Sequence, residues 1–239
     1  MSRLPIVQQS PTVPRDLPTV RQLEKLWDEI AARPLWAGGR FFAYLKLRAK
    51  MRLNFAERKR FTSIVPEGKV NDCSTCYELC CVGHDQTVSL RFRDIATLMD
   101  VERTDLITQT KPAFDKATRS AKPALARTVA SDAWTRFPVL AQTSYGACKA
   151  LSTEGKCTLY PHWPTSCARF PYALEVENST ITYSARCRSF WIRPDCGDKI
   201  DAMKVAAVAT YNERIKDLVL LAYAPRQLSE LGLMRFIGS

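Results

Sequence analysis

The sequence predicts a mainly helical α+β fold, in which helices pack around a loop-rich, cysteine-rich core that carries a small β-hairpin. Three observations lead to this fold class. Apolar residues recur at helical spacing near both ends of the chain, one alternating stretch is typical of a hairpin, and nine cysteines fall in the loop-rich middle. A chain of 239 residues, 46% of them hydrophobic, is long enough to bury a sizeable core.

The N-terminal part divides into an extended lead-in over residues 1–19 and a basic helical region over residues 20–64. Prolines recur through the lead-in and disfavour regular structure there. From residue 20 onward, apolar residues follow an i, i+3, i+4 pattern with charges between them, which predicts an amphipathic helix. The stripe consists of Val20, Leu23, Leu26, Trp27 and Ile30. A second helical stretch follows the break at Gly38 and Gly39.

The middle part, residues 65–197, is predicted to form one cysteine-cluster domain with a helical insert at about 104–140. A strand-like run ends at Leu90, and a helix starts near Arg93, with Asp94 where a carboxylate suits the positive end of the helix. Residues 172–177 and 180–184 flank a turn and predict the hairpin. We see no internal repeat in the sequence.

The C-terminal part, residues 198–239, is predicted to form helices that pack on this core. One long amphipathic helix runs from Asp198 to Ala224, Pro225 ends it, and a short last helix covers residues 228–236. The predicted apolar stripe of the long helix consists of Ile200, Met203, Ala207, Tyr211, Ile215, Leu218 and Ala222.

The expected compartment decides how the cysteines are interpreted. The N-terminus lacks the apolar run of a signal peptide, and no stretch reaches the roughly 18 apolar residues of a membrane-spanning helix. We therefore expect a cytoplasmic protein. Disulfides do not persist in a reducing compartment, so clustered cysteines indicate metal binding or redox chemistry.

The first four cysteines lie within nine residues. Cys73 and Cys76 are separated by two residues, which lets both sulfurs turn toward one ion. Cys80 and Cys81 are adjacent, so their side chains tend to point apart and can serve different corners of one cluster or different centres. This group is a strong signal for a metal and a weak signal for its identity.

The remaining cysteines, Cys148, Cys157, Cys167, Cys187 and Cys196, are spaced widely and form no knuckle of their own. They make sense as long-range ligands that fold back to the first group, with Cys196 as the odd one out. His84 and His162 fall near the cysteines, where either could be a structural residue, a ligand or a partner of a ligand. The predicted metal ligands are Cys73, Cys76, Cys80, Cys81, Cys148, Cys157, Cys167 and Cys187. Together they would make the core of the fold a cysteine-ligated metal core.

The order of motifs resembles a known family. Cys-x2-Cys-x3-Cys-Cys is followed by an apolar strand with Asp94 after it, and then by three late motifs. These are Gly146-Ala147-Cys148, Gly155-Lys156-Cys157-Thr158-Leu159-Tyr160 and Pro164-Thr165-Ser166-Cys167-Ala168-Arg169-Phe170-Pro171. This order is similar to the YkgJ-type cysteine-cluster family, which is described as a zinc- or iron-chelating domain. The chain departs from that pattern at Trp163 and Ala168, where the family usually has arginine.

An iron–sulfur cluster, or iron, is slightly favoured over zinc as the cofactor. Zinc sites commonly use two knuckle pairs and this chain offers one, whereas a cluster accepts irregularly spaced thiolates. The expected function is that of a metal-binding or redox module. The alternative is a cluster-dependent enzyme that modifies a protein side chain, because the resemblance extends distantly to flagellin lysine N-methylase. The sequence shows no hydrolase, zinc-protease or phosphate-loop motif, so no catalytic residue is assigned.

Charge is concentrated near the N-terminus. The net charge is +11, and residues 1–64 hold thirteen Lys or Arg against five Asp or Glu. The segment from Arg40 to Arg60 carries eight of these basic residues with aromatic residues between them. It is either a solvated helix face or a nonspecific contact for an anionic surface, and the protein partner is left open.

Overall fold

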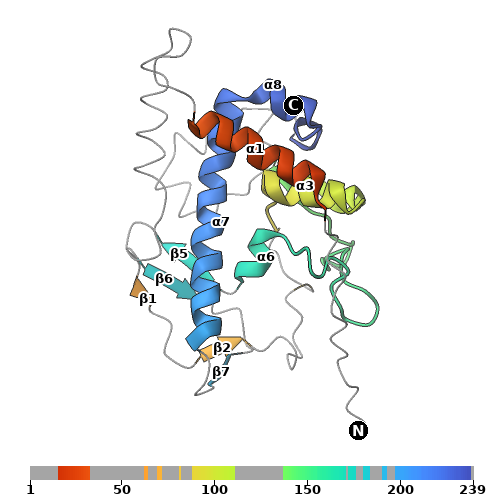
Figure 1. Ribbon diagram of the computed structural model, residues 1–239. Coiled ribbons are helices and arrows are strands. Elements are labelled where there is room, and N and C mark those ends of the chain that lie inside the picture. The colour runs from red at the N-terminus through yellow and green to blue at the C-terminus, as the bar shows by residue number, and fades with distance from the viewer. Residues whose placement is uncertain are drawn as a thin grey trace, which may run out of the picture.

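The fold is a mainly helical α+β arrangement, as the sequence predicts. The computed structural model describes residues 16–32, 62–63, 69–71, 81, 88–110, 137–170, 172–175, 180–183, 190–192 and 197–237. The helix α7 (Gly197–Tyr223) is the longest element, and the other described elements are arranged along it (Figure 1). The basic segment and the second predicted N-terminal helix lie outside the described residues.

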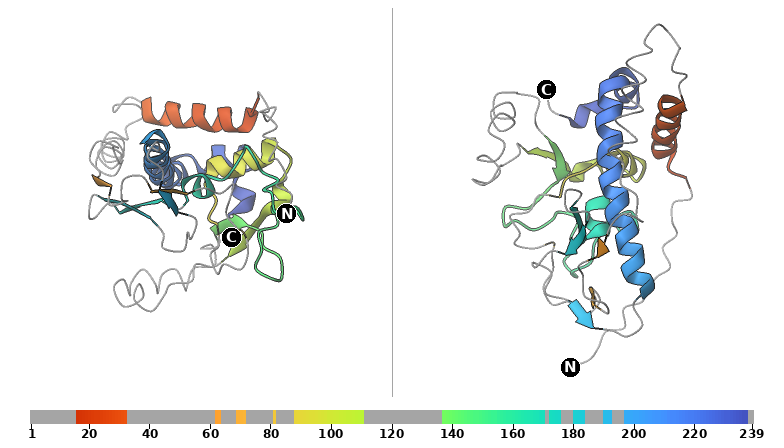
Figure 2. Two further views of the ribbon diagram at one scale, coloured as in Figure 1. Left: turned by 90° about the horizontal axis from the view of Figure 1, so that it is seen from below. Right: turned by 90° about the vertical axis from the view of Figure 1, so that its left-hand side faces the viewer.

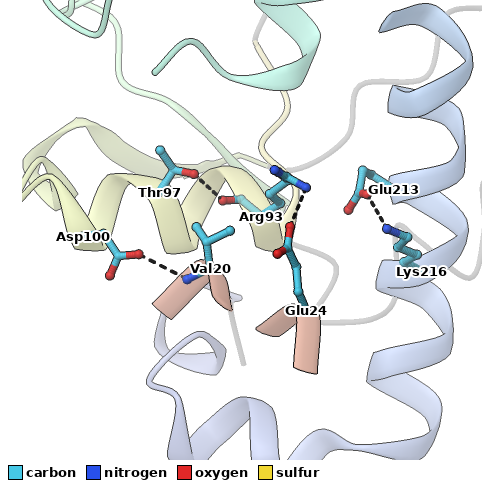
Figure 3. A network of polar contacts seen from close by, with 7 residues as sticks. All are labelled: Val20, Glu24, Arg93, Thr97, Asp100, Glu213 and Lys216. Carbon is cyan, nitrogen blue, oxygen red and sulfur yellow. Dashed lines mark hydrogen bonds and ion pairs between the residues drawn. The ribbon is translucent and has the colours of Figure 1, made fainter. Parts of the chain in front are cut away.

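Helix α1 (Pro18–Ala32) lies across α3 (Phe92–Asp100) and beside α7, at the end of the molecule that also holds the C-terminus (Figures 1 and 2). Its predicted apolar stripe is confirmed, because Val20, Leu23, Leu26 and Ile30 are all buried. Hydrogen bonds and an ion pair between α1 and α3 lie beside the buried apolar stripe and hold α1 in position (Figure 3). The Asp100 carboxylate accepts the Val20 N–H at 3.1 Å, and Arg93 Nη1 lies 2.8 Å from Glu24 Oε1.

The main core is formed by α1, α3, the C-terminal part of α7 and the segment after it. Side chains with almost no exposure come from each of these elements, so burial of apolar surface joins the two ends of the chain. The core residues with the least exposure are Ile95, Ala96, Leu98, Ala224, Leu228 and Leu233.

The predicted hairpin is confirmed. Strand β5 (Tyr172–Glu175) pairs antiparallel with β6 (Thr180–Tyr183), and Tyr172 lies opposite Tyr183. Further pairings extend the β content beyond this hairpin. Strand β1 (Thr62–Ser63) adds to β6 in parallel, and β2 (Lys69–Asn71) pairs antiparallel with β7 (Phe190–Ile192).

The ends of the predicted helical insert are strands rather than helices. After a short 3₁₀ helix (Thr104–Leu106), β3 (Ile107–Thr110) pairs antiparallel with β4 (Phe137–Leu140). Residues 107–110 are rich in β-branched side chains, which favour extended backbone, and their pairing partner lies almost thirty residues later in the sequence. Helical periodicity is therefore a poor guide at these positions. Residues 111–136 lie outside the described residues.

The long C-terminal helix is confirmed, but its predicted apolar stripe is only partly correct. Ala207 and Ile215 are buried, whereas Leu218 is 48% exposed. Val219 and Leu220 turn into the core instead, because the helix meets α1 and α3 only toward its C-terminal end. Pro225 does end α7, and it also opens α8 (Pro225–Glu230), where its missing N–H is tolerated in the first helical turn.

The predicted last helix over residues 228–236 is divided in two. Helix α8 ends at Glu230, and a 3₁₀ helix (Met234–Phe236) follows after Gly232, which has a φ of +75°. This left-handed glycine lets the chain reverse and bring Leu233 into the core. Within the described residues, no helix is both long and apolar enough to cross a lipid bilayer.

Candidate metal centre

Half of the predicted ligands lie in the described part of the structure. Cys81, Cys148, Cys157 and Cys167 are half-buried thiols, and the last three pack against the main core. The other four predicted ligands lie outside the described residues: Cys73, Cys76, Cys80 and Cys187. Cys196 and His84 also lie outside them. Among the described residues alone, no three His, Cys, Asp or Glu side chains are grouped closely enough to hold a metal ion.

Cys148 and Cys157 follow two turns that have the same hydrogen bonds. In the first turn, the Thr143 N–H donates to the carbonyl oxygen of Ala147 at 2.7 Å, and the Gly146 N–H donates to that of Thr143 at 3.0 Å. The second turn repeats both bonds nine residues later. Its pairs are Ser152 N–H to Lys156 O at 2.8 Å and Gly155 N–H to Ser152 O at 3.0 Å. The structure thus contains a short internal repeat that each time ends on a cysteine, which the sequence analysis missed.

The signal for this repeat is present in the sequence as two Gly-x-Cys motifs nine residues apart, each preceded by a hydroxyl residue three positions before the glycine. The Thr143 and Ser152 hydroxyls accept N–H groups from Ala147 and Lys156, at 3.2 and 3.1 Å. Side chains of this kind stabilise tight turns by bonding to nearby backbone. Each cysteine therefore directly follows a turn that is held by the same backbone and hydroxyl hydrogen bonds.

Both glycines of the repeat adopt left-handed backbone. Gly146 has a φ of +76° and Gly155 a φ of +75°. Replacing Gly146 with Ala should therefore destabilise the protein by about 1–2 kcal/mol, because a Cβ disfavours this backbone conformation. No heavy atom lies within 4 Å of the added Cβ, so a steric clash does not contribute. Urea unfolding measures the loss.

Gly146→Asn is the matched control for this change, because asparagine tolerates left-handed backbone better than alanine does. We expect its midpoint to lie between those of the parent and Gly146→Ala. An alanine variant as stable as the parent would show that the turn is not held in this conformation.

The first cysteine group meets the second through the backbone. The Cys148 N–H donates to the Cys81 carbonyl oxygen at 2.7 Å, although the two residues are far apart in the sequence. After each cysteine of the repeat the chain turns back again, with Leu151 N–H bonded to Cys148 O and Tyr160 N–H bonded to Cys157 O. An isolated antiparallel bridge pairs Leu151 with Cys157, so the backbone connects Cys148 to Cys157 through Leu151.

The Cys157 thiol lies in an environment that combines burial with hydrogen-bond donors. Burial raises the pKa of this thiol above its ordinary value, and the nearby Cys148 adds to the rise. Hydrogen bonds from the Leu159 and Tyr160 backbone and from the Trp163 side chain act in the opposite direction. Donors that converge on a half-buried sulfur are suited to a thiolate that is neutralised by a metal ion.

Cys167 is positioned by a helix rather than by a turn. It lies in the short helix α6 (Thr165–Arg169), and the first residue of that helix is bonded to α3. The Asp94 carboxylate accepts the Thr165 N–H at 2.8 Å and the Thr165 hydroxyl at 3.1 Å. It also accepts the Arg91 N–H at 2.8 Å, so that one buried carboxylate joins the starts of α3 and α6.

Two further contacts hold α6 in place. The Ser166 hydroxyl donates to the Ser89 carbonyl oxygen at 3.0 Å, and the Thr210 hydroxyl of α7 lies 3.3 Å from the Thr165 carbonyl oxygen. The sequence analysis placed Asp94 early in a helix but had no means of finding Thr165 as its partner.

Replacing Asp94 with Ala should destabilise the protein by about 1–3 kcal/mol and lower the retention of metal. Three donors lose their acceptor, and this loss exceeds the relief from removing a buried carboxylate. Metal content after gel filtration and urea unfolding near neutral pH measure the two effects. Thr165→Val removes only the hydroxyl donor and should be milder. Full metal retention by the Asp94 variant would contradict a positioning role for this residue.

Asp217 is a second carboxylate at the same junction, half-buried whereas Asp94 is buried, and the sequence analysis did not identify it. Its Oδ1 accepts the Phe92 N–H at 3.3 Å, at the start of α3. Burial raises the pKa of Asp217 to about 8, while the charge of Arg91 lowers it and those of Glu213 and Asp94 raise it. Burial likewise raises the pKa of Asp94 to about 6, although hydrogen bonds from Thr165 and Arg91 oppose the rise.

A comparison with known protein families decides how this cysteine arrangement is interpreted. Residues 72–214, about three fifths of the chain, match the model of the CxxCxxCC family, described as "Putative zinc- or iron-chelating domain". The chain belongs to the CxxCxxCC family. The match includes all nine cysteines, Asp94, both turns of the repeat and most of α7. Neither the curated proteins nor the solved structures contain a significant match.

The donor set fits the metal chelation given in the description of the CxxCxxCC family. Thiolates are ligands for both zinc and iron, and the four described cysteines are half-buried thiols on the same core. His162 offers a nitrogen as well, because its Nε2 is buried and has no hydrogen-bond partner among the residues that the structure describes. The resemblance suggested by the sequence is confirmed, and metal binding is the function that the family match supports.

Proposed function

We propose that this chain binds an iron–sulfur cluster, or iron, through the thiolates of Cys81, Cys148, Cys157 and Cys167 together with Cys73, Cys76, Cys80 and Cys187, and that it acts as a metal-binding or redox module. The observation that carries the proposal is the backbone link between the two cysteine groups. The hydrogen bond from Cys148 to Cys81 places the end of the first group against the nine-residue repeat. Thiolates from distant parts of the chain can then reach one region.

The chain's own residues would hold such a centre in three ways. The two turns fix the backbone of Cys148 and Cys157, and Asp94 holds the helix that carries Cys167. Backbone N–H groups of Leu159 and Tyr160 stabilise negative charge on the Cys157 sulfur. A bound cluster would supply one-electron chemistry, which these residues tune through hydrogen bonds and partial burial.

Iron is favoured because the ligands are spaced irregularly. The first group offers one two-residue knuckle, whereas the repeat presents single cysteines nine residues apart. A cluster tolerates this spacing because its sulfides complete the coordination of each iron.

Zinc is the second candidate, and one observation favours it. His162 lies between Cys157 and Cys167 in the sequence, and within the described ranges its buried Nε2 has no hydrogen-bond partner. Structural zinc sites often combine three cysteines with one histidine. A buried imidazole nitrogen without a partner suits a ligand of this kind.

Anaerobic purification followed by metal and sulfide analysis and by absorption spectroscopy tests the proposal. Iron and inorganic sulfide together, with broad visible absorption that bleaches on reduction, would support the iron–sulfur assignment. Colourless protein containing stoichiometric zinc would support the second candidate and contradict the first. Protein that contains neither metal, and that binds neither after reconstitution, would refute both assignments.

A further inference from the structure

Two arginines meet where α3 begins and α6 ends. Arg91 immediately precedes α3, and Arg169 is the last residue of α6. The bonds from Thr165 to Asp94 and from Ser166 to Ser89 hold these two segments together. Burial lowers the pKa of Arg169, and the positive charge of Arg91 lowers it further. Arg169 lies four positions after Thr165, on the same side of α6, and Asp94 accepts both the Thr165 N–H and the Arg91 N–H, so the two arginines start from neighbouring positions at this junction.

Within the described part of the chain, each guanidinium has at least one nitrogen without an acceptor. Arg169 Nη1 donates to the Tyr172 carbonyl oxygen at a long 3.3 Å. Among the described residues, the Nε atoms of Arg91 and Arg169 are both buried without a hydrogen-bond partner. Buried donors are normally paired with an acceptor, so two unpaired ones at one junction indicate that a binding partner is missing. Each side chain as a whole is half-buried.

The nearby carboxylates do not supply this partner. Asp94 already accepts hydrogen bonds from the Arg91 backbone and from Thr165. Asp217 accepts the Phe92 N–H, and its pKa of about 8 leaves it mostly protonated at neutral pH. Within the part of the chain that the structure describes, no ion pair joins either arginine to a carboxylate.

We propose that Arg91 and Arg169 together bind an oxyanion, a phosphate or carboxylate group, at the junction of α3 and α6. Planar guanidinium groups present paired N–H donors that match two oxygens of such a group, and one anion between them removes their repulsion. The anion neutralises the junction that also holds the helix of Cys167. This site is distinct from the thiolate centre and does not depend on which metal that centre holds.

Isothermal titration calorimetry on the full chain, as purified with its metal, tests the site with two probes. Inorganic phosphate and acetate are titrated at constant ionic strength, with sodium chloride as the reference. Saturable binding of phosphate alone assigns the site to a phosphoryl group, and binding of acetate as well extends it to carboxylates. If neither probe binds more tightly than chloride, the proposal is overturned.

Variants tie the binding to the two arginines. Arg169→Gln and Arg91→Gln should each weaken phosphate binding by about tenfold or more, because each removes a charged pair of donors. Arg226→Gln is the matched control, since the Arg226 side chain is 88% exposed and lies on α8. Equal phosphate affinity in all three variants would overturn the proposal.

A conservative variant keeps the test valid if a glutamine variant fails to fold. Arg169→Lys retains the charge and the apolar stem but loses the planar pair of donors, so its phosphate binding should also weaken. Metal content is measured in parallel. Normal metal content with lost phosphate binding supports a separate oxyanion site, whereas unchanged phosphate binding in Arg169→Lys and Arg91→Gln argues against it.

Discussion

Replacing Cys157 with Ser should remove most of the bound metal and unfold the cysteine-cluster domain under conditions where the parent protein is folded. Serine keeps nearly the volume of cysteine but cannot supply a thiolate. Binding of a structural metal contributes on the order of 10 kcal/mol or more to folding, which is comparable to the whole stability of a typical domain. Metal analysis and thermal unfolding measured on the same preparation test both effects together.

Two comparisons make this result specific to the metal centre. Cys148→Ser, Cys76→Ser and Cys80→Ser should behave like Cys157→Ser, because all four cysteines are proposed ligands. Cys196→Ser should be much milder, since Cys196 is the cysteine left over from the eight. If Cys157→Ser keeps its full metal content and melts like the parent, the repeat does not carry a ligand.

The helices at the two ends of the chain could be predicted because their signal is local. Leu23, Leu26 and Ile30 repeat at helical spacing, and burial of that stripe follows directly. The same reasoning fails along α7, where Leu218 fits the helical stripe yet remains exposed. The face that a long helix buries depends on which neighbours it meets, and this information is not contained in its own periodicity.

The short strands show the same dependence on partners. The hairpin β5–β6 was predictable because its two halves are adjacent in the sequence. Strands β3 and β4 were not, because each needs a partner from beyond residues 111–136 to form a sheet. Residues 107–110 alone carry too little information to distinguish a strand from a helix.

Some residues of the candidate site could be recognised from the sequence, and others could not. The cysteines are recognisable from residue type and spacing, and Gly146 and Gly155 are recognisable as turn residues next to them. The residues that hold the site are not, because their partners are distant. Asp94 and Thr165 are separated by 71 positions, and Phe92 and Asp217 by 125. A single sequence gives no evidence that such residues meet.

These distant contacts share one consequence for stability. Asp94 is buried and Asp217 is half-buried where α3 starts, and each accepts a backbone N–H there. Burial disfavours the charged form of a carboxylate more strongly than these bonds favour it, so the pKa of each carboxyl group is raised. The junction of α3, α6 and α7 should therefore become less stable as its carboxyl groups lose protons.

Asp217→Asn should make the protein more stable than the parent at about pH 8, and leave it about equally stable near pH 4. The folded-state pKa of Asp217, about 8, is higher than its ordinary value of 3.8, so the folded state binds this proton more tightly than the unfolded state. Stability contributed by the proton is complete below about pH 4 and is lost as the pH rises through about 8. A difference of about four pKa units corresponds to a loss on the order of 5 kcal/mol in the parent.

Asparagine resembles the protonated carboxyl group, because it is neutral and keeps an oxygen that can accept the Phe92 N–H. The variant should therefore lack most of the loss that the parent shows between pH 4 and pH 8. Urea unfolding of both proteins across this range, at constant ionic strength, measures the difference. Metal ligands also deprotonate in this range, but they do so in both proteins, and their effect cancels in the comparison.

Asp105→Asn supplies the control, because Asp105 has an exposed side chain that forms an ion pair with Arg103. An exposed ion pair contributes at most about 1 kcal/mol, so this variant should follow the parent curve closely. The groups that face Asp217 are Arg91, Glu213 and Asp94, and all of them are unchanged in Asp217→Asn. Parallel curves for Asp217→Asn and the parent, with no divergence toward alkaline pH, would show that the pKa of Asp217 is the same in the folded and unfolded protein, so that no retained proton stabilises the junction.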